Sequence, residues 1–301
     1  PYTVQPGDSL SRTAKRELGS YDLWKVIYEA NRGQVSDPNV IRPGQVLTIP
    51  GSRGTEGEKA EDPATAQFIA QIQARFEETL NTVLATTSVD LTVNDPETGL
   101  RRVRSGETNL GDLTADAYPY VLGADIGFSN GGGIRDNIAA GNITYNDTLR
   151  VFPYGNMGCV VEATGQQIKD ALEMGVKNYP EESGGFQHVS GLTFTVDSSI
   201  PSSVQLDDKR NFVAVTGPYR VTDILVNGEP LDVNKTYTVA SHNYMLKNGG
   251  DGMNMFMGCN ILQDEVMADV DILSTYVRDN LGGTVGAEYA NPAGQGRITI
   301  K

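Results

Sequence analysis

Arginine side chains gather in one short stretch of this 301-residue sequence. Arg101, Arg102 and Arg104 fall within four positions of a chain whose formal net charge is −14. A guanidinium group can hold two phosphate oxygens at once, so such a cluster favours an anionic ligand. A solvated surface is the alternative explanation for these arginines.

A glycine-rich stretch follows a predicted strand over residues 124–128. Its letters SNGGGIR cover residues 129–135, with three glycines in a row after Asn130 and a cation at Arg135. Glycines let backbone amides approach a ligand closely, and the arginine adds positive charge. Glycine triplets also form ordinary loops, so this stretch alone does not identify a site.

Two further stretches place a tyrosine beside glycine or proline. FPYGN covers residues 152–156 and contains Tyr154, and NYMLKNGGDG covers residues 243–252 and contains Tyr244 and Asp251. A planar base held between two such rings gains about 1–3 kcal/mol per stacking contact. Partial burial in the core is the alternative for each tyrosine taken singly.

Strands and amphipathic helices surround these stretches and must position them. The expected strands cover residues 158–163, 192–196, 221–226, 236–240 and 297–300, and the expected helices cover residues 164–176 and 270–281. Their irregular alternation predicts an α+β fold with mixed strand pairing.

The first 50 residues have a pattern of their own. A short strand over 2–4 precedes a helix that Asp8 can cap and that ends at Gly19. A second helix is expected over 22–31, and an alternating strand over 45–49. The order β-α-α-β places two helices over a two-stranded sheet.

This segment resembles a LysM module along its whole length. The matching letters are YTVQPGDSL over 2–10, Asn31, and IRPGQVLTIP over 41–50. The resemblance implies binding to an N-acetylglucosamine glycan such as peptidoglycan or chitin. It places the glycan contacts at Gly7, Asp8, Ser9, Leu10, Ile41 and Arg42. A role in the fold alone, with the module acting as a spacer, is the alternative.

Composition divides the chain into three parts. Residues 1–50 are the expected LysM domain, residues 51–62 (GSRGTEGEKAED) a flexible linker, and residues 63–301 a second domain. Asp62 and Pro63 begin a predicted helix. Its apolar stripe must be buried, and consists of Phe68, Ile72, Phe76, Leu80 and Leu84.

Taken in their order along the chain, the arginine cluster and the three stretches described after it resemble the C-terminal domain of the 5'-nucleotidase family. The resemblance spans roughly residues 68–301 and includes GGF at 184–186. It implies a four-layer α-β-β-α structure with mixed sheets that recognises a nucleoside or nucleoside 5'-monophosphate. The predicted fold class is therefore α+β, a βααβ LysM module followed by this domain.

The same resemblance implies a role for individual residues around the nucleoside. Tyr154 and Tyr244 would stack on the base, and Asp251 would accept hydrogen bonds from the ribose hydroxyls. Asn130 would read the edge of the base, with a backbone contact from Gly184.

The resemblance also implies that arginines bind the phosphate. Arg104 and Arg135 would face it, with Arg101 or Arg102 as a further helper.

Catalysis in this family uses two divalent metal ions held by a separate domain. This chain has two histidines, His188 and His242, and neither belongs to a metal-ligand pattern, so both are interpreted as structural. No catalytic residue and no cofactor are therefore expected in the chain, and the metal pair is expected in a metallophosphoesterase domain before Pro1. The chain alone is predicted to be inactive.

The predicted function is the nucleotide-recognition portion of a bacterial 5'-nucleotidase-type enzyme that is secreted or associated with the cell wall. A non-catalytic nucleotide-binding wall protein is one alternative. A relative of UDP-sugar hydrolases or 2',3'-cyclic-nucleotide phosphodiesterases is the other.

The acidic charge argues against nucleic acid polymers as partners. No apolar stretch approaches the length of a membrane span. Cys159 and Cys259 are expected as free thiols, with a disulfide as the alternative.

Overall fold

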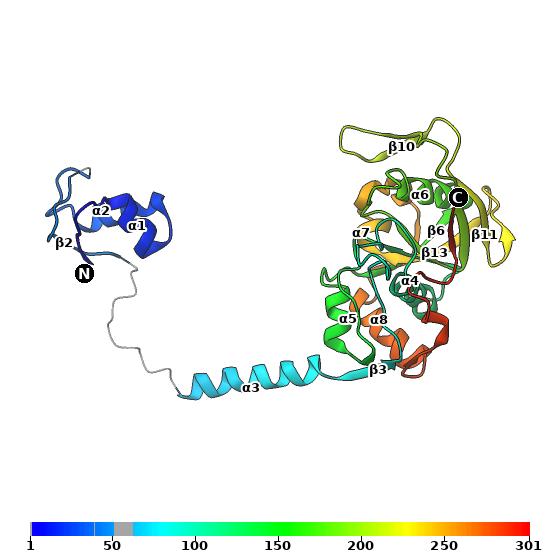
Figure 1. Ribbon diagram of the computed structural model, residues 1–301, viewed down its shortest axis with the longest axis horizontal. Coiled ribbons are helices and arrows are strands. Elements are labelled where there is room, and N and C mark those ends of the chain that lie inside the picture. Colours follow the sequence, from blue (N-terminus) through cyan, green and yellow to red (C-terminus); the bar gives the residue numbers. More distant parts are fainter. Residues whose placement is uncertain (1, 39, 51–62) are drawn as a thin grey trace. The chain divides into compact units, whose positions relative to one another are not determined.

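The computed structural model describes residues 2–38, 40–50 and 63–301, with the backbone alone at several positions of the helix that begins at Pro63. The predicted linker over 51–62 lies outside the described residues. The chain divides into two compact units, Pro1–Gln73 and Ala74–Lys301 (Figure 1). None of the helices in the described ranges is both long and apolar enough to cross a bilayer.

The first unit has the predicted β-α-α-β order. Its elements are β1 (Tyr2–Thr3), α1 (Leu10–Leu18), the single turn η1 (Tyr21–Leu23), α2 (Trp24–Ala30) and β2 (Val46–Leu47), and β1 pairs antiparallel with β2. Asn31 joins the two halves, because its amide group donates to the carbonyls of Ile27 and Thr48 and accepts from the amide of Thr48. The predicted cap at Asp8 is wrong, because Ser9 caps α1 and Asp8 accepts from the amide of Gln5 instead. Gly19 ends the helix as predicted, in the left-handed conformation at φ 85°.

The long helix α3 (Pro63–Leu80) begins at the predicted proline and is followed by the strand β3 (Val83–Thr87). The predicted burial of its apolar stripe is wrong at Phe76, whose side chain is 61% exposed. Leu84 is buried, but it lies on β3 and not on the helix. The four-residue spacing therefore continued across a boundary between two elements, and periodicity alone does not reveal such a boundary.

The larger unit is built on a five-stranded mixed sheet with the order β14-β6-β13-β4-β7. These strands are β4 (Ile126–Asn130), β6 (Gly158–Thr164), β7 (Gln187–Ser190), β13 (Thr236–His242) and β14 (Asn260–Gln263). Strand β13 runs parallel to β4 and antiparallel to β6. Strand β7 runs antiparallel to β4.

A second mixed sheet has the order β12-β11-β8-β16. Its strands are β8 (Leu192–Val196), β11 (Val221–Val226), β12 (Glu229–Pro230) and β16 (Ile298–Ile300). The smaller pairings join β3 with β5 (Gly141–Thr144) and β15 (Thr284–Val285), and β9 (Val204–Leu206) with β10 (Phe212–Val215). The predicted α+β class with mixed sheets is confirmed.

Helices and single turns complete the larger unit. The helices are α4 (Asn109–Leu122), α5 (Tyr145–Val151), α6 (Gly165–Gly175), α7 (Asn243–Leu246) and α8 (Asp269–Thr275). The single turns are η2 (Gly250–Gly252), η3 (Asn254–Phe256), η4 (Tyr276–Asn280) and η5 (Ala287–Tyr289).

The five-stranded sheet has a hydrophobic core on each face. Helices α4 and α8 share one core with side chains such as Val160 and Ala240. Helix α6 and the four-stranded sheet share the other core with neighbouring side chains such as Val161 and Val239. Successive residues of a strand point to opposite faces, which explains why adjacent residues enter different cores.

Helix α4 lies unusually close to β7. A Cβ atom at Gly111 would stand 2.0 Å from the Nδ1 atom of His188, so a glycine is required for this approach. His188 is fully buried there, and its Nε2 atom bonds the carbonyl of Val103 at 2.9 Å. The burial and the backbone contact of His188 agree with the structural role that was predicted for it from the sequence.

Glu107 follows the arginine cluster in the sequence and contacts the C-terminal end of the chain. Its buried carboxylate accepts the backbone amides of Gln295, Arg297 and Ile298 at 2.7, 3.0 and 2.8 Å. The side chain of Arg297 also pairs with the carboxylate of Asp116 at 2.7 Å. These contacts attach the C-terminal strand β16 to the start of α4, so Glu107 has a structural role.

Candidate functional site

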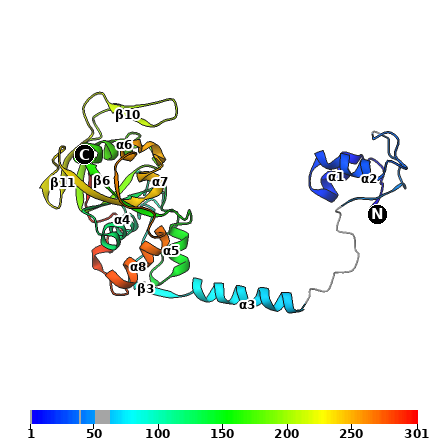
Figure 2. The same cartoon turned by 180° about the vertical axis from the view of Figure 1, so that it is seen from behind.

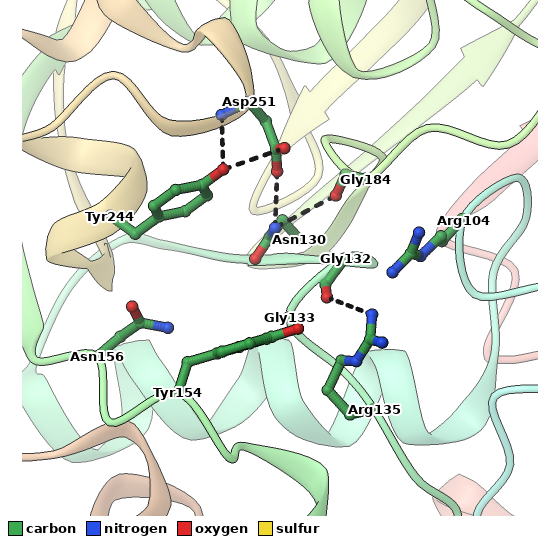
Figure 3. A pocket seen from close by; sticks show the side chains of 10 residues that line it. All are labelled: Arg104, Asn130, Gly132, Gly133, Arg135, Tyr154, Asn156, Gly184, Tyr244 and Asp251. Atoms are coloured by element: carbon green, nitrogen blue, oxygen red, sulfur yellow. Dashed lines mark hydrogen bonds between the residues drawn. The ribbon is translucent and has the colours of Figure 1, made fainter. Parts of the chain in front are cut away.

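One pocket of about 370 Å³ gathers residues from segments far apart in the chain (Figure 3). Its lining residues are Arg104, Asn130, Gly132, Gly133, Arg135, Tyr154, Asn156, Gly184, Tyr244 and Asp251. All seven substrate-binding residues predicted from the sequence are among them. Their role in binding stays a prediction.

The topology of the five-stranded sheet explains why these segments meet. The parallel strands β4 and β13 end at Asn130 and His242, on the same edge of the sheet. The antiparallel strands β6 and β7 begin on that edge, where Gly158 pairs with His242 and Gln187 pairs with Asn130. The loops before β6 and β7 and those after β4 and β13 therefore open on one side.

The floor of the pocket is a hydrogen-bonded group centred on Asn130. Its amide nitrogen donates to an Asp251 carboxylate oxygen at 2.8 Å and to the Gly184 carbonyl at 3.2 Å. Its amide oxygen lies 2.9 Å from the Nε2 atom of His242. Burial lowers the pKa of His242 to about 4, so this histidine is neutral near pH 7 and its Nε2 atom serves as the donor.

The two predicted stacking rings lie on opposite sides of the pocket (Figure 3). Tyr154 is 60% exposed and Tyr244 is 40% exposed, so both rings offer surface to a ligand. Tyr244 is held in place by Asp251, whose backbone amide donates to the tyrosine hydroxyl at 3.2 Å. Its ring also lies against Gly250, where a Cβ atom would come within 2.4 Å of the ring.

Positive charge is concentrated at one end of the pocket. The guanidinium group of Arg135 donates to the Gly132 carbonyl at 3.3 Å and lies 5.8 Å from the centre of the Tyr154 ring. The Nε atom of Arg104 is buried without a hydrogen-bond partner in the described residues. Burial lowers the pKa of Arg104, and the charges of Arg101 and Arg135 lower it further. An anion between the Arg104 and Arg135 side chains would relieve this repulsion.

The other two arginines of the cluster are engaged elsewhere. Arg101 pairs with Glu182, with its Nε atom 2.9 Å from the carboxylate. Arg102 pairs with Asp95 at 3.1 Å and donates to the Glu107 carbonyl at 2.9 Å. Neither lines the pocket, so their predicted helper role gains no support from this arrangement.

Gly132, Gly133 and Asn156 also line the pocket, although the predicted substrate-binding residues do not include them. All three belong to stretches that the sequence had singled out, so the signal was present. Figure 3 shows the Asn156 side chain beside Tyr154, on the side of the pocket away from Arg104. His242, beneath Asn130, was interpreted only as structural, because a lone histidine gives no sign of which side chain it supports.

The predicted glycan contacts lie in the first unit. Gly7 is exposed, Asp8 and Ser9 are partly buried, and Leu10 is buried in the core with 2% exposure. Ile41 packs against the same core. Arg42 is exposed and lines a hollow of about 470 Å³ together with Gln34, Val35, Ser36, Val40 and Gln45. Glycan binding by the predicted residues stays a prediction.

Metal ligands are scarce in the part of the chain that the structure describes. No group of three or more histidine, cysteine, aspartate or glutamate side chains there could hold a metal ion. Burial lowers the pKa of both histidines to about 4, and both already contact protein groups. These residues do not fit the two-metal centre that the resemblance implies. Cys159 and Cys259 are free thiols, as expected.

Comparison with known proteins agrees with the fold. The family described as "5'-nucleotidase, C-terminal domain" matches residues 83–258, and the family described as "LysM domain" matches residues 2–50. The chain is 32% identical over 247 residues to the trifunctional nucleotide phosphoesterase protein YfkN of Bacillus subtilis, covering 79% of this chain and 15% of that protein. It is 30% identical over 227 residues to a 5'-nucleotidase of Vibrio vulnificus, covering 75% of this chain and 36% of that protein.

A solved structure gives the same picture. The chain is similar to the crystal structure of a 5'-nucleotidase precursor from Thermus thermophilus, with a TM-score of 0.61 and 29% sequence identity. The match covers 79% of this chain and 43% of that one. The chain thus spans less than half the length of each of these relatives.

Proposed function

Because this chain belongs to the 5'-nucleotidase family, as a C-terminal domain of that family preceded by a LysM domain, we propose that its pocket binds a nucleoside or nucleoside 5'-monophosphate. One observation carries the proposal. Two aromatic rings, a carboxylate, an amide and two guanidinium groups from separate segments line one cavity. Aromatic rings can stack on a base, a carboxylate can bind ribose hydroxyls, and guanidinium groups can bind a phosphate.

The base would lie between Tyr154 and Tyr244. Each ring is partly exposed toward the pocket, and stacking contributes about 1–3 kcal/mol per contact. Asn156, beside Tyr154 in Figure 3, would meet the edge of the base. Asn130 reaches the same space but already uses its amide nitrogen and oxygen in the floor, so its main effect is to hold Asp251.

The ribose would lie against Asp251. This carboxylate is fixed by Asn130 and by the backbone of its own turn, which contacts the Tyr244 hydroxyl. An ionised carboxylate can accept hydrogen bonds from both ribose hydroxyls. The 5'-phosphate would then reach the end of the pocket where Arg104 and Arg135 lie.

Hydrolysis would depend on a metal-binding domain outside these 301 residues. Two metal ions supply the nucleophile and stabilise the charge in such reactions. The described residues offer binding and orientation only, so the isolated chain is proposed to hold its ligand without cleaving it. A phosphate-release assay on AMP with added Mn²⁺ tests this, and robust turnover by the pure chain would overturn it.

The LysM domain would attach the protein to an N-acetylglucosamine glycan, which supports a place outside the cell at the bacterial wall. Sedimentation with purified peptidoglycan tests this part. A chain that stays entirely in the supernatant, with the LysM unit folded, would contradict it.

Calorimetry with adenosine and AMP tests the pocket itself. Tyr154→Ala and Tyr244→Ala should each weaken adenosine binding by about 1–3 kcal/mol. Asp251→Ala should have a similar effect through the loss of charged hydrogen bonds. Arg135→Ala should weaken AMP binding more than adenosine binding. Tyr120→Ala is a matched control, because Tyr120 is 64% exposed but does not line the pocket. Equal affinities for all variants would rule the pocket out.

A further inference from the structure

A second cavity adjoins the first pocket at Asp251. It measures about 410 Å³ and shares Gly184, Tyr244 and Asp251 with the first pocket. Three cationic residues line it, namely Lys177, Lys209 and Arg210. We call this cavity the basic annex, defined by these three cations and Asp251. Nothing in the proposed binding of a nucleoside 5'-monophosphate uses it.

The cations of the annex lack carboxylate partners. Among the described residues, none of the three forms an ion pair. The ammonium group of Lys177 has one long hydrogen bond, at 3.4 Å to the Met174 carbonyl. Burial lowers the pKa of Lys177, while the charge of Asp251 opposes this effect. A partly buried ammonium group with so little compensation favours a bound anion.

Lys209 and Arg210 come from the hairpin of β9 and β10, which lies beside α6 (Figures 1 and 2). The carboxylate of Asp207 organises its tip by accepting the amides of Lys209 and Asn211 and the side chain of Asn211. That acid is therefore used within the hairpin. Asp208, the other acid of the tip, does not line the annex.

The hairpin tip is tied to the loop that carries Asp251. A Cβ atom at Gly252 would stand 2.6 Å from the carbonyl oxygen of Arg210, so the two backbones touch. Arg210 and Asp251 both adopt positive φ angles, at 67° and 54°. Such backbone is uncommon for residues other than glycine and tends to gather at functional sites.

The charge of the annex is positive in a strongly acidic chain. Two acids line it, Glu182 and Asp251. Glu182 is neutralised by its ion pair with Arg101. Among the described residues, the three cations therefore share the annex with one carboxylate that forms no ion pair, Asp251, in a protein of formal net charge −14. This local reversal of sign favours an anion with more than one charge.

We propose that the basic annex binds a phosphate group carried on the 2'- or 3'-hydroxyl of a nucleotide in the first pocket. The proposal rests on the proposed function, in which Asp251 contacts the ribose hydroxyls. A substituent on one hydroxyl would pass Asp251 into the annex, while the other hydroxyl keeps its hydrogen bond to the carboxylate. The ligand class then includes nucleoside 3',5'-bisphosphates.

Calorimetry on the full chain with AMP and adenosine 3',5'-bisphosphate tests this. The bisphosphate should bind about tenfold more tightly than AMP, since charged hydrogen bonds are added. The double variant Lys209→Ala/Arg210→Ala should lose this advantage and keep the AMP affinity of the wild type. The variant Lys235→Ala/Arg278→Ala removes one lysine and one arginine elsewhere in the same unit, and it should keep the advantage.

The outcomes separate the two proposals. If AMP binds and the bisphosphate binds no better, or if the annex variant keeps the advantage, the annex proposal fails and the proposed function stands. If neither adenosine nor AMP binds, the proposed function fails. If the control variant loses the advantage as fully as the annex variant, general surface charge explains the result and the annex proposal is overturned.

Discussion

At the scale of single residues, the arrangement of the pocket depends on a side chain that does not line it, namely His242. His242 is buried with 2% exposure and contacts the amide oxygen of Asn130, which in turn holds Asp251. Because His242 is neutral near pH 7, it supplies one donor without adding charge. Positioning of this kind fixes the orientation of the Asn130 amide, so its nitrogen faces the carboxylate.

Removing the His242 donor should weaken adenosine binding. In His242→Phe the buried oxygen of Asn130 loses its partner, which costs about 1–3 kcal/mol and frees the amide to turn. Calorimetry should therefore show that His242→Phe binds adenosine more weakly than the wild type. His242→Gln, which can still donate, should recover part of the loss. A loss that is equal in both variants would indicate a packing role alone.

Adenosine binding should also be insensitive to protonation of His242 above about pH 5, since the pKa of this histidine is lowered to about 4 by burial. A wild-type affinity that rises or falls through pH 6.5, with no such change in His242→Gln, would contradict the neutral state assigned to it. Calorimetric titrations between pH 5.5 and 8 provide the measurement.

At the scale of elements, the start of α4 and the C-terminal strand are joined through a buried pair of acids. Asp112 accepts the Gln295 amide at 2.8 Å next to Glu107, which accepts the same amide. Burial, and then the charge of Glu107, raise the pKa of Asp112 to about 9. The folded protein therefore holds a proton that the unfolded chain releases near pH 4.

This pair makes stability dependent on pH. Between about pH 4 and pH 9 the folded state binds more protons than the unfolded state, so the free energy of unfolding falls as pH rises. The slope approaches about 1.4 kcal/mol per pH unit if one full proton is involved. Asp112→Asn should flatten it, because the amide cannot titrate.

Urea unfolding at pH 5, 7 and 9, followed by far-ultraviolet circular dichroism, measures the effect. Asp208→Asn, at an exposed position of the same unit, serves as the control and should keep the wild-type slope. An Asp112→Asn variant with an unchanged pH dependence would show that Asp112 is ionised in the folded protein.

At the scale of the whole molecule, two compact units carry two different kinds of predicted site. The glycan residues belong to Pro1–Gln73 and the pocket belongs to Ala74–Lys301. Each unit has hydrophobic core residues of its own. Attachment to a wall glycan and recognition of a nucleotide would thus be separate tasks of one chain.

Each ligand should stabilise the unit that binds it. A ligand at 100 times its Kd raises the free energy of unfolding by about 2.7 kcal/mol. Trp24 is the one tryptophan of the chain and belongs to the first unit, so its fluorescence follows that unit's unfolding. AMP should raise the midpoint temperature of the unfolding transition seen by circular dichroism. An N-acetylglucosamine oligomer should raise the midpoint temperature of the transition seen by fluorescence. AMP acting on the fluorescence transition alone would contradict this division.

The sequence by itself determined the two families, the β-α-α-β order of the first unit and, through the family resemblance, seven of the ten residues that line the pocket. The order of elements in the first unit follows from local features, because glycines, caps and alternating apolar residues act over a few positions. Tyr154 and Tyr244 were predictable for the same reason, since each stands in a loop marked by glycine or proline.

Tertiary structure alone decided which polar groups were already occupied. Arg101 and Arg102 are held by Glu182 and Asp95, while Arg104 faces the pocket, although all three arginines are chemically alike. The annex joins Lys177 to Arg210 across 33 positions of sequence, which no local pattern reveals. Such contacts depend on how distant segments pack, and chain topology sets that packing rather than any single stretch of residues.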